Sequence, residues 1–562
     1  MSTSALPQSS SATWNRRMRR TALAAVLSSA LIATACSNPD GGSTSAEGAS
    51  DADKNDTVVL LTGDELGQYN PIGVHGRSGD SHIFEGLYRV EPGVVDKQPE
   101  LQPVLAAGPA TANSDNTVWT VPVASGIKFS DGTDFGPEDV VATFKAIQDE
   151  RSASEEASTW DFVKSVEEKD GNVVFTLERP FAEFPRLLLN GIAPSEAFDF
   201  NNLGPAEDSE LNTKPVGTGP YKLESLRADE AVLTARDDYR AGAPEVKKIV
   251  VRHAPDENSR AQQIKSGEGD GTILEPKLAL DFDGQDGYTV TAATSADWRG
   301  ITLPSGNPFT GDAKVRQALN YAIDRDAMVR DVLDGKGHAN STFFASFYGK
   351  AFDKDSQFTH DQEKAEKLLD EAGWTKGADG IREKDGQKAS FDIIYFPNRD
   401  AARLDLTLAT VSDLKKIGVE ANPVAIEPKN ISADQVHTTP VMLGGGELPY
   451  TVDSQIYRLL HGKYAVAGQG GKFDNASDYS NPAIDALLDA ARSESDADKR
   501  DELYRSLQRE YIENPAMLQI AYVDHMYVTR DQGYKTSPLV LEPHSHGVTF
   551  GPWLHINEWT KK

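Results

Sequence analysis

The segment from Ser125 to Ile147, SGIKFSDGTDFGPEDVVATFKAI, constrains the fold of this 562-residue chain more than any other. Ile127 and Phe129 alternate with polar residues and lead into the turn sequence Ser-Asp-Gly-Thr, as the end of a strand does. Pro137 suits the first position of a helix, and the apolar residues after it recur at helical spacing. The segment therefore predicts a strand end, a turn and a helix that pack as one α/β unit.

Length and charge narrow the class of protein. A chain of 562 residues is too long for one simple core and should divide into lobes. Its net charge of −29 argues against nucleic acid as a partner, because binding nucleic acid needs a basic face. Beyond the first 35 residues, no segment reaches the ~18 consecutive apolar residues of a membrane helix. We therefore expect the body of the protein to lie outside the bilayer.

The N-terminal residues have the pattern of an export signal. Four arginines between residues 16 and 20 precede an apolar run from Thr21 to Ile32, which ends in Ala33-Thr34-Ala35-Cys36. This ending resembles a lipobox, in which the cysteine is acylated, and Cys36 is the single cysteine of the chain. We expect a signal peptide over residues 1–35 and a lipid-anchored flexible leash over residues 36–56, with Sec or twin-arginine export left open.

Further motifs follow in a fixed order along the chain. Val216–Leu223 reads VGTGPYKL, Lys314–Val332 reads KVRQALNYAIDRDAMVRDV, and Asp361–Trp374 reads DQEKAEKLLDEAGW. Together with the FSDG segment, these motifs resemble the signatures of the family 5 extracellular solute-binding proteins, the peptide and nickel receptors of ABC importers. The resemblance extends over about residues 57–530, which is nearly the whole chain after the N-terminal segment.

The resemblance implies an α/β, two-lobed periplasmic-binding-protein-like fold of type II, from the large cluster, with an inserted subdomain in the first lobe. The expected boundaries are lobe I (first part) 57–96, inserted subdomain 97–213, lobe I (second part) 214–297, lobe II 298–522 and C-terminal return to lobe I 523–562. It also implies a monomer on the outer face of the plasma membrane, which captures a peptide by lobe closure and delivers it to an ABC permease and ATPase complex.

The sequence does not support an enzyme. It contains no nucleophile elbow, HExxH motif, zinc-spaced Cys/His set or Walker lysine, so we expect no catalytic residue, cofactor or metal site. His544 and His546 are separated by one residue in a Gly/Pro-rich tail, and we expect them to be surface residues rather than metal ligands.

The expected ligand-binding residues come from two parts of the chain. Tyr69 and Asn70 match the family's cleft position after the first strand, and His75 lies close behind them. Trp298 and Arg299 enter the second lobe, where an indole can stack on a ligand and a guanidinium can pair with a carboxylate.

A third group of expected ligand-binding residues lies in an unusual loop. Within Gly444-Gly445-Gly446, Gly446 stands at or near the position where the family carries a tryptophan, and Tyr450 is aligned with the family's tyrosine. The family's amine-binding aspartate is replaced by Pro449, so Glu447 or Asp453 would have to supply the carboxylate.

Two alternatives to a peptide receptor stay open. The Pro449-Tyr450 pair also occurs in nickel-chelate receptors, so one alternative is a receptor for a metal chelate or an opine-like ligand. The glycine-filled loop motivates the other, an envelope regulatory or scaffold lipoprotein that has kept the binding fold without transport.

Overall fold

The computed structural model describes residues 56–562, except for 74–81, 398–400, 447–450, 466–470 and 545–546. The expected signal peptide, the lipidation site Cys36 and the leash up to residue 55 lie outside the described residues. Among the described residues, no helix combines the length and the apolar composition needed to cross a bilayer.

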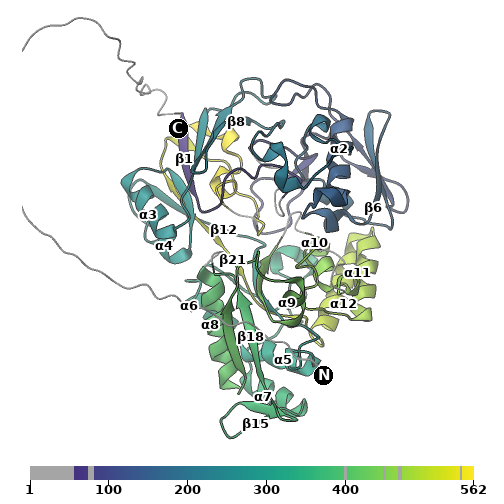
Figure 1. Ribbon diagram of the computed structural model, residues 1–562, viewed down its shortest axis with the longest axis vertical. Coiled ribbons are helices and arrows are strands. Elements are labelled where there is room, and N and C mark those ends of the chain that lie inside the picture. The colour runs from purple at the N-terminus through teal and green to yellow at the C-terminus, as the bar shows by residue number, and fades with distance from the viewer. Residues whose placement is uncertain (1–55, 74–81, 398–400, 447–450, 466–470, 545–546) are drawn as a thin grey trace, which may run out of the picture. The chain divides into compact units, whose positions relative to one another are not determined.

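A mixed seven-stranded sheet is built from segments that are far apart in the sequence (Figure 1). Strand β1 runs parallel to β10 and β11, and the outer strands are antiparallel to their neighbours. The strand order is β12 (Tyr288–Ala293), β22 (His525–Arg530), β11 (Gly271–Leu274), β1 (Thr57–Thr62), β10 (Lys248–His253), β9 (Glu230–Ala235) and β8 (Tyr221–Leu226). The C-terminal part of the chain thus returns to the sheet that the first described strand begins.

Helices α3 (Glu257–Ser266) and α4 (Pro276–Leu280) contribute to a small core against this sheet. Asp256 caps the first of them by accepting a hydrogen bond from the backbone N–H of Ser259 at 2.7 Å, and Gly267 ends it in the left-handed region at φ 83°. Two short hairpins lie elsewhere in the chain, β2 (Tyr88–Val90) with β3 (Leu101–Pro103), and β23 (Tyr534–Lys535) with β24 (Thr560–Lys561).

The segment from Ser125 to Ile147 forms part of a separate unit built on a four-stranded sheet. Its sheet has the order β4 (Thr111–Ala112), β5 (Val118–Pro122), β7 (Asn172–Leu177) and β6 (Val163–Lys169). Helix α2 (Pro137–Gln148) begins at the predicted proline, and Asp139 accepts from the backbone N–H of Gly136 at 2.8 Å. The expected strand end is a single bridge between Lys128 and Asp134, so the turn and the helix are confirmed but the strand is shorter than predicted.

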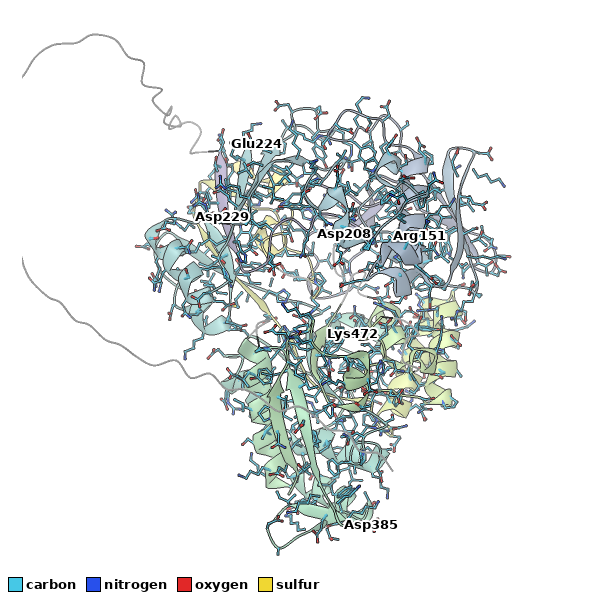
Figure 2. All side chains as sticks on the ribbon, in the orientation of Figure 1. Arg151, Asp208, Glu224, Asp229, Asp385 and Lys472 are labelled. Carbon is cyan, nitrogen blue, oxygen red and sulfur yellow. The ribbon has the colours of Figure 1, made fainter. Side chains whose placement is uncertain are left out.

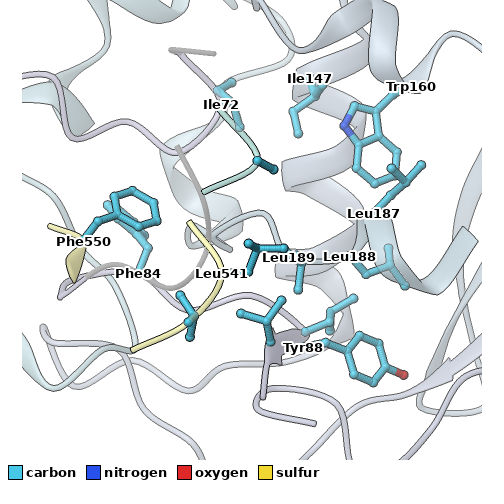
Figure 3. Close-up of a cluster of buried hydrophobic side chains, with 14 of the residues drawn as sticks. Ile72, Phe84, Tyr88, Ile147, Trp160, Leu187, Leu188, Leu189, Leu541 and Phe550 are labelled. Atoms are coloured by element: carbon cyan, nitrogen blue, oxygen red, sulfur yellow. The ribbon is translucent and has the colours of Figure 1, made fainter. Parts of the chain in front are cut away.

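One large apolar core joins this four-stranded unit to the first sheet. Phe144 of α2 packs on Trp160 and Phe175 with ring centroids 4.5 and 5.2 Å apart. Figure 3 shows part of this core, where Trp160 lies near Leu187, Ile72 lies near Ile147, and Phe84 contributes from the other side of the view.

A second sheet has the order β14 (Gly337–Ala339), β21 (Met517–Val523), β13 (Trp298–Thr302) and β20 (Met442–Gly445). The parallel pair β18 (Ser390–Tyr395) and β19 (Glu420–Ala425) continues it through a bridge between Ile394 and Val441. A small three-stranded sheet lies apart: β15 (Thr375–Lys376), β16 (Arg382–Lys384) and β17 (Gln387–Lys388).

Eight helices of the described chain follow β13. Helices α5, α7 and α8 contribute apolar residues to a core of their own with one face of the second sheet. In chain order the eight are α5 (Ala313–Ala322), α6 (Arg325–Asp331), α7 (Gln362–Glu371), α8 (Ala401–Lys416), α9 (Ala433–Thr438), α10 (Val452–Leu460), α11 (Pro482–Ser493) and α12 (Ala497–Tyr511). The motif of residues 314–332 is divided between α5 and α6.

Residues 157–183 of the four-stranded unit meet residues 452–500, which include α10 and α11, along an interface that we call the seam. Asp161 accepts hydrogen bonds from Lys463 at 2.6 Å and from the Tyr464 hydroxyl at 3.1 Å. Arg179 donates to the Tyr457 hydroxyl at 2.9 Å. The seam therefore links segments about 300 residues apart in the sequence by polar contacts as well as by packing.

Acidic side chains cover much of the described surface, as expected from the net charge. Figure 2 shows Asp208, Glu224, Asp229 and Asp385 projecting from different elements, and all four are exposed. These four acidic residues do not form one patch; distributed charge of this kind favours solubility in general.

Candidate functional site

Two chain crossings connect the seven-stranded sheet with the second sheet. Strand β12 continues into β13 through residues 294–297, and β21 continues into β22 through Asp524. The crossings are bonded to each other, because the backbone N–H of Val523 donates to the carbonyl of Asp297 at 2.8 Å and the Ser295 hydroxyl donates to the Val523 carbonyl at 2.5 Å. We call this region the hinge.

The C-terminal tail adds a third segment to the hinge. The N–H of Ala296 donates to the carbonyl of Glu542 at 2.7 Å, and the N–H of Glu542 donates to the carbonyl of Thr294 at 3.1 Å. Two residues later, the N–H of His544 donates to the carbonyl of Gly446 at 2.7 Å. The tail is therefore tied both to a crossing and to the loop that follows β20.

A buried cluster of charged side chains surrounds Asp297, whose exposed fraction is 0 %. One carboxylate oxygen is bonded to Arg299 and lies 2.6 Å from Nδ1 of His544. The other lies 3.1 Å from Nε2 of His525, whose Nδ1 is 2.7 Å from Glu542. Three segments of the chain meet here, residues 297–299, His525 and the tail at residues 542–544, and each buried carboxyl group has a basic partner, as burial of charge requires.

The cluster sets the protonation of its members. Burial opposes a charge on His525, but its hydrogen bonds to Asp297 and Glu542 outweigh burial and raise its pKa to about 9. Burial also disfavours the Asp297 carboxylate, yet Arg299 and His544 hold the pKa of Asp297 well below its usual range. His525 is therefore a cation at neutral pH.

Basic groups converge beside Gly444 in β20. A Cβ atom at residue 444 would lie 2.6 Å from Nη1 of Arg299, 2.9 Å from Nη2 of Arg403 and 3.1 Å from the ring of His544. Arg403 comes from the first turn of α8, where it donates to the carbonyl of Met442 at 3.2 Å and lies over the ring of Phe396. Two guanidinium groups and an imidazole thus meet at the end of β20 nearest the hinge.

The glycines of this loop are explained by their neighbours. At Gly445 a Cβ would lie 2.6 Å from the indole ring of Trp298, and at Gly446 it would lie 1.9 Å from the carbonyl oxygen of Ala296. Gly446 also has φ 131°, a conformation that side chains disfavour. The three glycines leave room for a guanidinium pair, an indole and a hinge strand. We call Trp298, Arg299, Arg403, Gly444–Gly446 and His544 the hinge site.

Comparisons with known proteins place the chain in a family. Residues 100–466 match the model described as bacterial extracellular solute-binding proteins, family 5 middle. The chain belongs to this family. Protein XP55 of Streptomyces lividans is 35% identical over 541 residues, covering 92% of this chain and 93% of that protein. The oligopeptide-binding protein AppA of Bacillus subtilis is 27% identical, covering 83% of this chain and 89% of AppA.

Solved structures agree with the family. NikZ of Campylobacter jejuni, in complex with Ni(L-His), matches with a TM-score of 0.78 and 25% identity over 90% of this chain and 100% of that one. AppA of Bacillus subtilis, in complex with a nonapeptide, matches with a TM-score of 0.74 and 23% identity over 90% and 99%. The two-lobed fold expected from the sequence is thereby confirmed, and the family 5 protein is a receptor for solutes outside the cell.

The side chain of Asn70 makes hydrogen bonds within the fold of the family 5 protein. Its side-chain amide donates to the carbonyl of Ala206 at 3.1 Å, and its side-chain oxygen accepts from the N–H of Ile72 at 3.3 Å. Tyr69 is half-buried beside it. The role of both residues in binding stays a prediction, and the known contacts of Asn70 are those of a residue that shapes a turn.

Asp453 has a strong partner within the chain. Its two carboxylate oxygens accept from Nε and Nη2 of Arg492 at 2.8 and 2.6 Å, and both side chains are buried in the seam. We therefore do not retain Asp453 as the group that binds a ligand amine. His75, Glu447 and Tyr450 lie outside the described residues, so their roles stay predictions.

Trp298 and Arg299 open β13 directly after the crossing at residues 294–297, and their role in binding a ligand stays a prediction. Trp298 is 2 % exposed and packs edge-on against Phe343 at 5.4 Å between ring centroids. Sequence reasoning missed Arg403 and treated His544 as a surface residue, whereas its side chain is bonded to buried Asp297. No local motif marks either residue, because each reaches the site only through the fold.

Other candidate sites have less structural support than the hinge site. A pocket of about 500 Å³ lies between the β2–β3 hairpin and the last residues of the chain, but its charges pair with each other, Arg240 with Glu85 and Arg89 with Glu558. Within the part of the chain that the structure describes, no group of three His, Cys, Asp or Glu residues could hold a metal ion.

Proposed function

We propose that this family 5 protein is the lipid-anchored receptor of an ABC importer and that it captures short peptides between its two lobes. The ligand docks at the hinge site, the lobes close, and the loaded receptor delivers the peptide to a permease and ATPase complex. No covalent bond is made or broken. Residues 36–56 act as the leash on the outer face of the plasma membrane, and the lobe boundaries are those expected from the sequence.

The convergence of basic groups at the hinge is the observation that supports this proposal most directly. A peptide carries a carboxylate, and its desolvation requires charge-assisted hydrogen bonds. Arg299 and Arg403 approach the same point beside Gly444, where the absence of a side chain leaves space for both guanidinium groups. Trp298 adds an apolar face next to Gly445, against which a peptide backbone can pack.

The position of the site at the hinge explains how binding becomes closure. A ligand stabilises the closed form only by the free energy of the contacts that it makes in that form and not in the open one. The hinge site combines residues of the second sheet with His544 of the tail, which is bonded to the crossing at Asp297. A ligand held there touches the segments whose relative position changes on closure.

A metal chelate is the second candidate, and one observation favours it. The ring of His544 lies beside the two arginines, and imidazole is a ligand that nickel accepts. The related structure with the highest TM-score given above holds Ni(L-His). The same basic groups would pair with the carboxylates of such a chelate, so the geometry of the anion-binding part serves both candidates.

Thermal unfolding with defined ligands separates the candidates. The purified protein is heated alone, with alanine peptides of two to six residues, and with Ni²⁺ plus L-histidine. We expect one or more peptides to raise the Tm, because a ligand at about 100 times its Kd adds ~2.7 kcal/mol to stability by mass action. The chelate is expected to leave the Tm unchanged.

The other outcomes contradict the proposal in different ways. A shift with the nickel chelate alone would favour the second candidate, and no shift with either class would favour the scaffold alternative. Native mass spectrometry of protein purified from its own cells gives an independent answer, since a co-purified peptide has a mass that a chelate cannot match. Radiolabelled palmitate incorporation that is lost in Cys36→Ser tests the lipid anchor.

A further inference from the structure

Two buried glutamines of the second lobe differ in how their carboxamides are satisfied. Gln508 of α12 is 0 % exposed; its amide donates to the carbonyls of Ala351 at 2.6 Å and Tyr504 at 3.1 Å, and its oxygen accepts from the N–H of Asp353 at 2.9 Å. Gln519 of β21 is also 0 % exposed, but neither its Nε2 nor its Oε1 has a hydrogen-bond partner among the described residues.

The carboxamide of Gln519 lies over Gly300 in the neighbouring strand. A Cβ at residue 300 would lie 2.5 Å from Oε1 of Gln519, and the pairing of β13 with β21 is interrupted by a bulge at this point. Because side chains two apart in a strand share a face, Gln519 lies on the same face of the sheet as Trp298. Gly300 provides the space that its side chain fills.

Trp298 presents a second polar group of the same kind. Its Nε1 is buried and, within the described chain, has no hydrogen-bond acceptor. This nitrogen would lie 3.2 Å from a Cβ at Gly445, next to the loop of the hinge site. Trp298 near the hinge and Gln519 further into the second lobe are therefore two buried side chains with unpartnered polar atoms, among the described residues, on the same face of the β13–β21 pair.

Such groups are costly to a fold. A buried donor or acceptor that lacks a partner loses its bonds to water without replacement, so native proteins keep few of them. Gln519 carries both a donor and an acceptor, whichever way the carboxamide is oriented. An apolar residue of similar size would fill the same space without that penalty, so its retention here is explained if a ligand supplies the missing bonds.

We propose that Gln519, with Trp298 at its entrance, forms the polar end of a pocket that selects the ligand's side chain. The inference rests on the proposed function and names its substrate class: peptides with a side chain that both donates and accepts hydrogen bonds, such as the carboxamide of glutamine. Arg299, the neighbour of Trp298 in β13, projects from the opposite face of the strand and meets Arg403 of α8 beside Gly444, so the carboxylate and the selected side chain are bound separately.

Calorimetry with matched peptides tests the proposal. The probes are tetra-alanine and the four tetrapeptides that carry one glutamine among alanines. For the wild-type protein we expect one glutamine peptide to bind about tenfold to 100-fold more tightly than tetra-alanine. In Gln519→Leu this preference disappears while tetra-alanine binds as before, and Trp298→Phe, which keeps a smaller aromatic ring but removes the N–H donor, weakens the preference by a smaller factor.

The unliganded protein provides a second readout. Because Gln519→Leu removes two polar atoms without partners, its Tm is expected to rise by about one to two degrees, and Gln519→Met should behave alike. The matched control Gln508→Leu breaks three hydrogen bonds and should lower the Tm without changing the preference among peptides.

The outcomes distinguish the inference from the proposed function. If no peptide binds the wild-type protein, the proposed function fails and the inference falls with it. If peptides bind but the wild-type protein and Gln519→Leu show the same preference, only the inference fails. A fall in Tm for Gln519→Leu with unchanged preference would assign the carboxamide a structural partner, such as an ordered water, and would also overturn it.

Discussion

The seam and the hinge site both bury charged and polar side chains, but they do so in different ways. In the seam, Arg492 and Asp453 satisfy each other with two hydrogen bonds, and the Arg492 guanidinium lies 3.2 Å from the ring centroid of Tyr457. In the hinge site, basic groups converge on a glycine, and nearby polar atoms of Trp298 and Gln519 lack partners among the described residues.

The difference shows where the chain has been shaped for stability and where it has been shaped for recognition. A fully paired interface contributes most to the stability of the fold, and its polar groups are already used in bonds within the chain. A region with convergent cations, small residues and unsatisfied polar atoms costs the fold some stability, and natural proteins tolerate such a cost mainly at functional sites. Substitutions in the two regions should therefore separate stability from affinity.

Breaking the central pair of the seam should have the largest effect. Asp453→Ala leaves the buried guanidinium of Arg492 without its carboxylate, and we expect the free energy of unfolding to fall by about 3–5 kcal/mol. Urea denaturation measures this loss. Asp331→Ala removes an exposed carboxylate that pairs with Arg330 outside the seam, so it serves as a control with little or no loss.

The same variant tests whether Asp453 binds a ligand amine. If Asp453→Ala folds with unchanged stability but no longer binds any peptide, then Asp453 binds the ligand and does not stabilise the seam, which contradicts the contrast between the seam and the hinge site.

Raising the pH should weaken the hinge cluster before it weakens the seam. The pKa of His525 is about 9 in the folded protein, against 6.5 for an unperturbed histidine, because Asp297 and Glu542 stabilise its charged form despite burial. Its contribution is therefore complete below about pH 6.5 and is lost as the pH rises through about 9; the shift corresponds to ~3 kcal/mol.

The measurement is the free energy of unfolding of the wild-type protein minus that of His525→Gln across this pH range. We expect this difference in free energy to shrink steadily from pH 6.5 to 9.5. Tyr527 and His544 also contact the cluster, but they are the same in both proteins, so the difference reports on His525. A difference that does not change with pH would mean that His525 is not charged in the folded state.

Arg403→Met should separate affinity from stability within the hinge site. The substitution keeps an apolar side chain of similar length over Phe396 but removes the guanidinium, and we expect peptide Kd to rise by about 30- to 100-fold, equivalent to ~2–3 kcal/mol. Isothermal titration calorimetry measures the Kd, and the Tm should change by a few degrees at most. Arg403→Lys, which keeps the charge but not the planar fork, should lose affinity only in part.

A large fall in the Tm of Arg403→Met together with an unchanged Kd would give Arg403 a structural role, like that of Arg492 in the seam.

Adding one methyl group beside the converging basic groups should have a smaller effect. In Gly444→Ala the new Cβ would lie 2.6 Å from Nη1 of Arg299, which must move, and we expect roughly tenfold weaker peptide binding with ~1 kcal/mol lost from stability. Gly204→Ala is the control, because a Cβ there meets no atom within 4 Å and its φ is not positive. Equal effects of the two substitutions on the Kd would remove Gly444 from the site.

The sequence predicted the local features of both regions well. The helix that begins at Pro137 and the helices α5 and α6 were predictable because apolar periodicity and capping residues encode them within a few residues. The family resemblance itself is confirmed by the family model and the related structures, whereas the binding role expected for Trp298 and Arg299 stays a prediction.

The partners of these residues could not be predicted, because they depend on contacts across the chain. Arg403, Gly444 and His544 meet only after α8, β20 and the C-terminal tail have been assembled. The glycine loop illustrates the limit. From the sequence it is a site that has lost its usual tryptophan, whereas in the structure each glycine makes space for a specific neighbour. Asp453 is the opposite case, a plausible ligand-binding acid whose partner, Arg492, lies 39 residues further on.

The exposed ion pair of the seam between Lys463 and Asp161 should matter least. Their side chains are 37% and 29% exposed, and Asp161 also accepts from the Tyr464 hydroxyl, so Lys463→Met should cost less than about 0.5 kcal/mol at physiological salt and nothing measurable in 1 M NaCl. Lys128→Met removes a similar exposed pair with Asp134 outside the seam and should behave the same in urea denaturation. A loss above about 2 kcal/mol, or a tenfold change in peptide Kd, for Lys463→Met alone would show that exposed charges of the seam control closure, and the division between a stabilising seam and a recognising hinge would no longer hold.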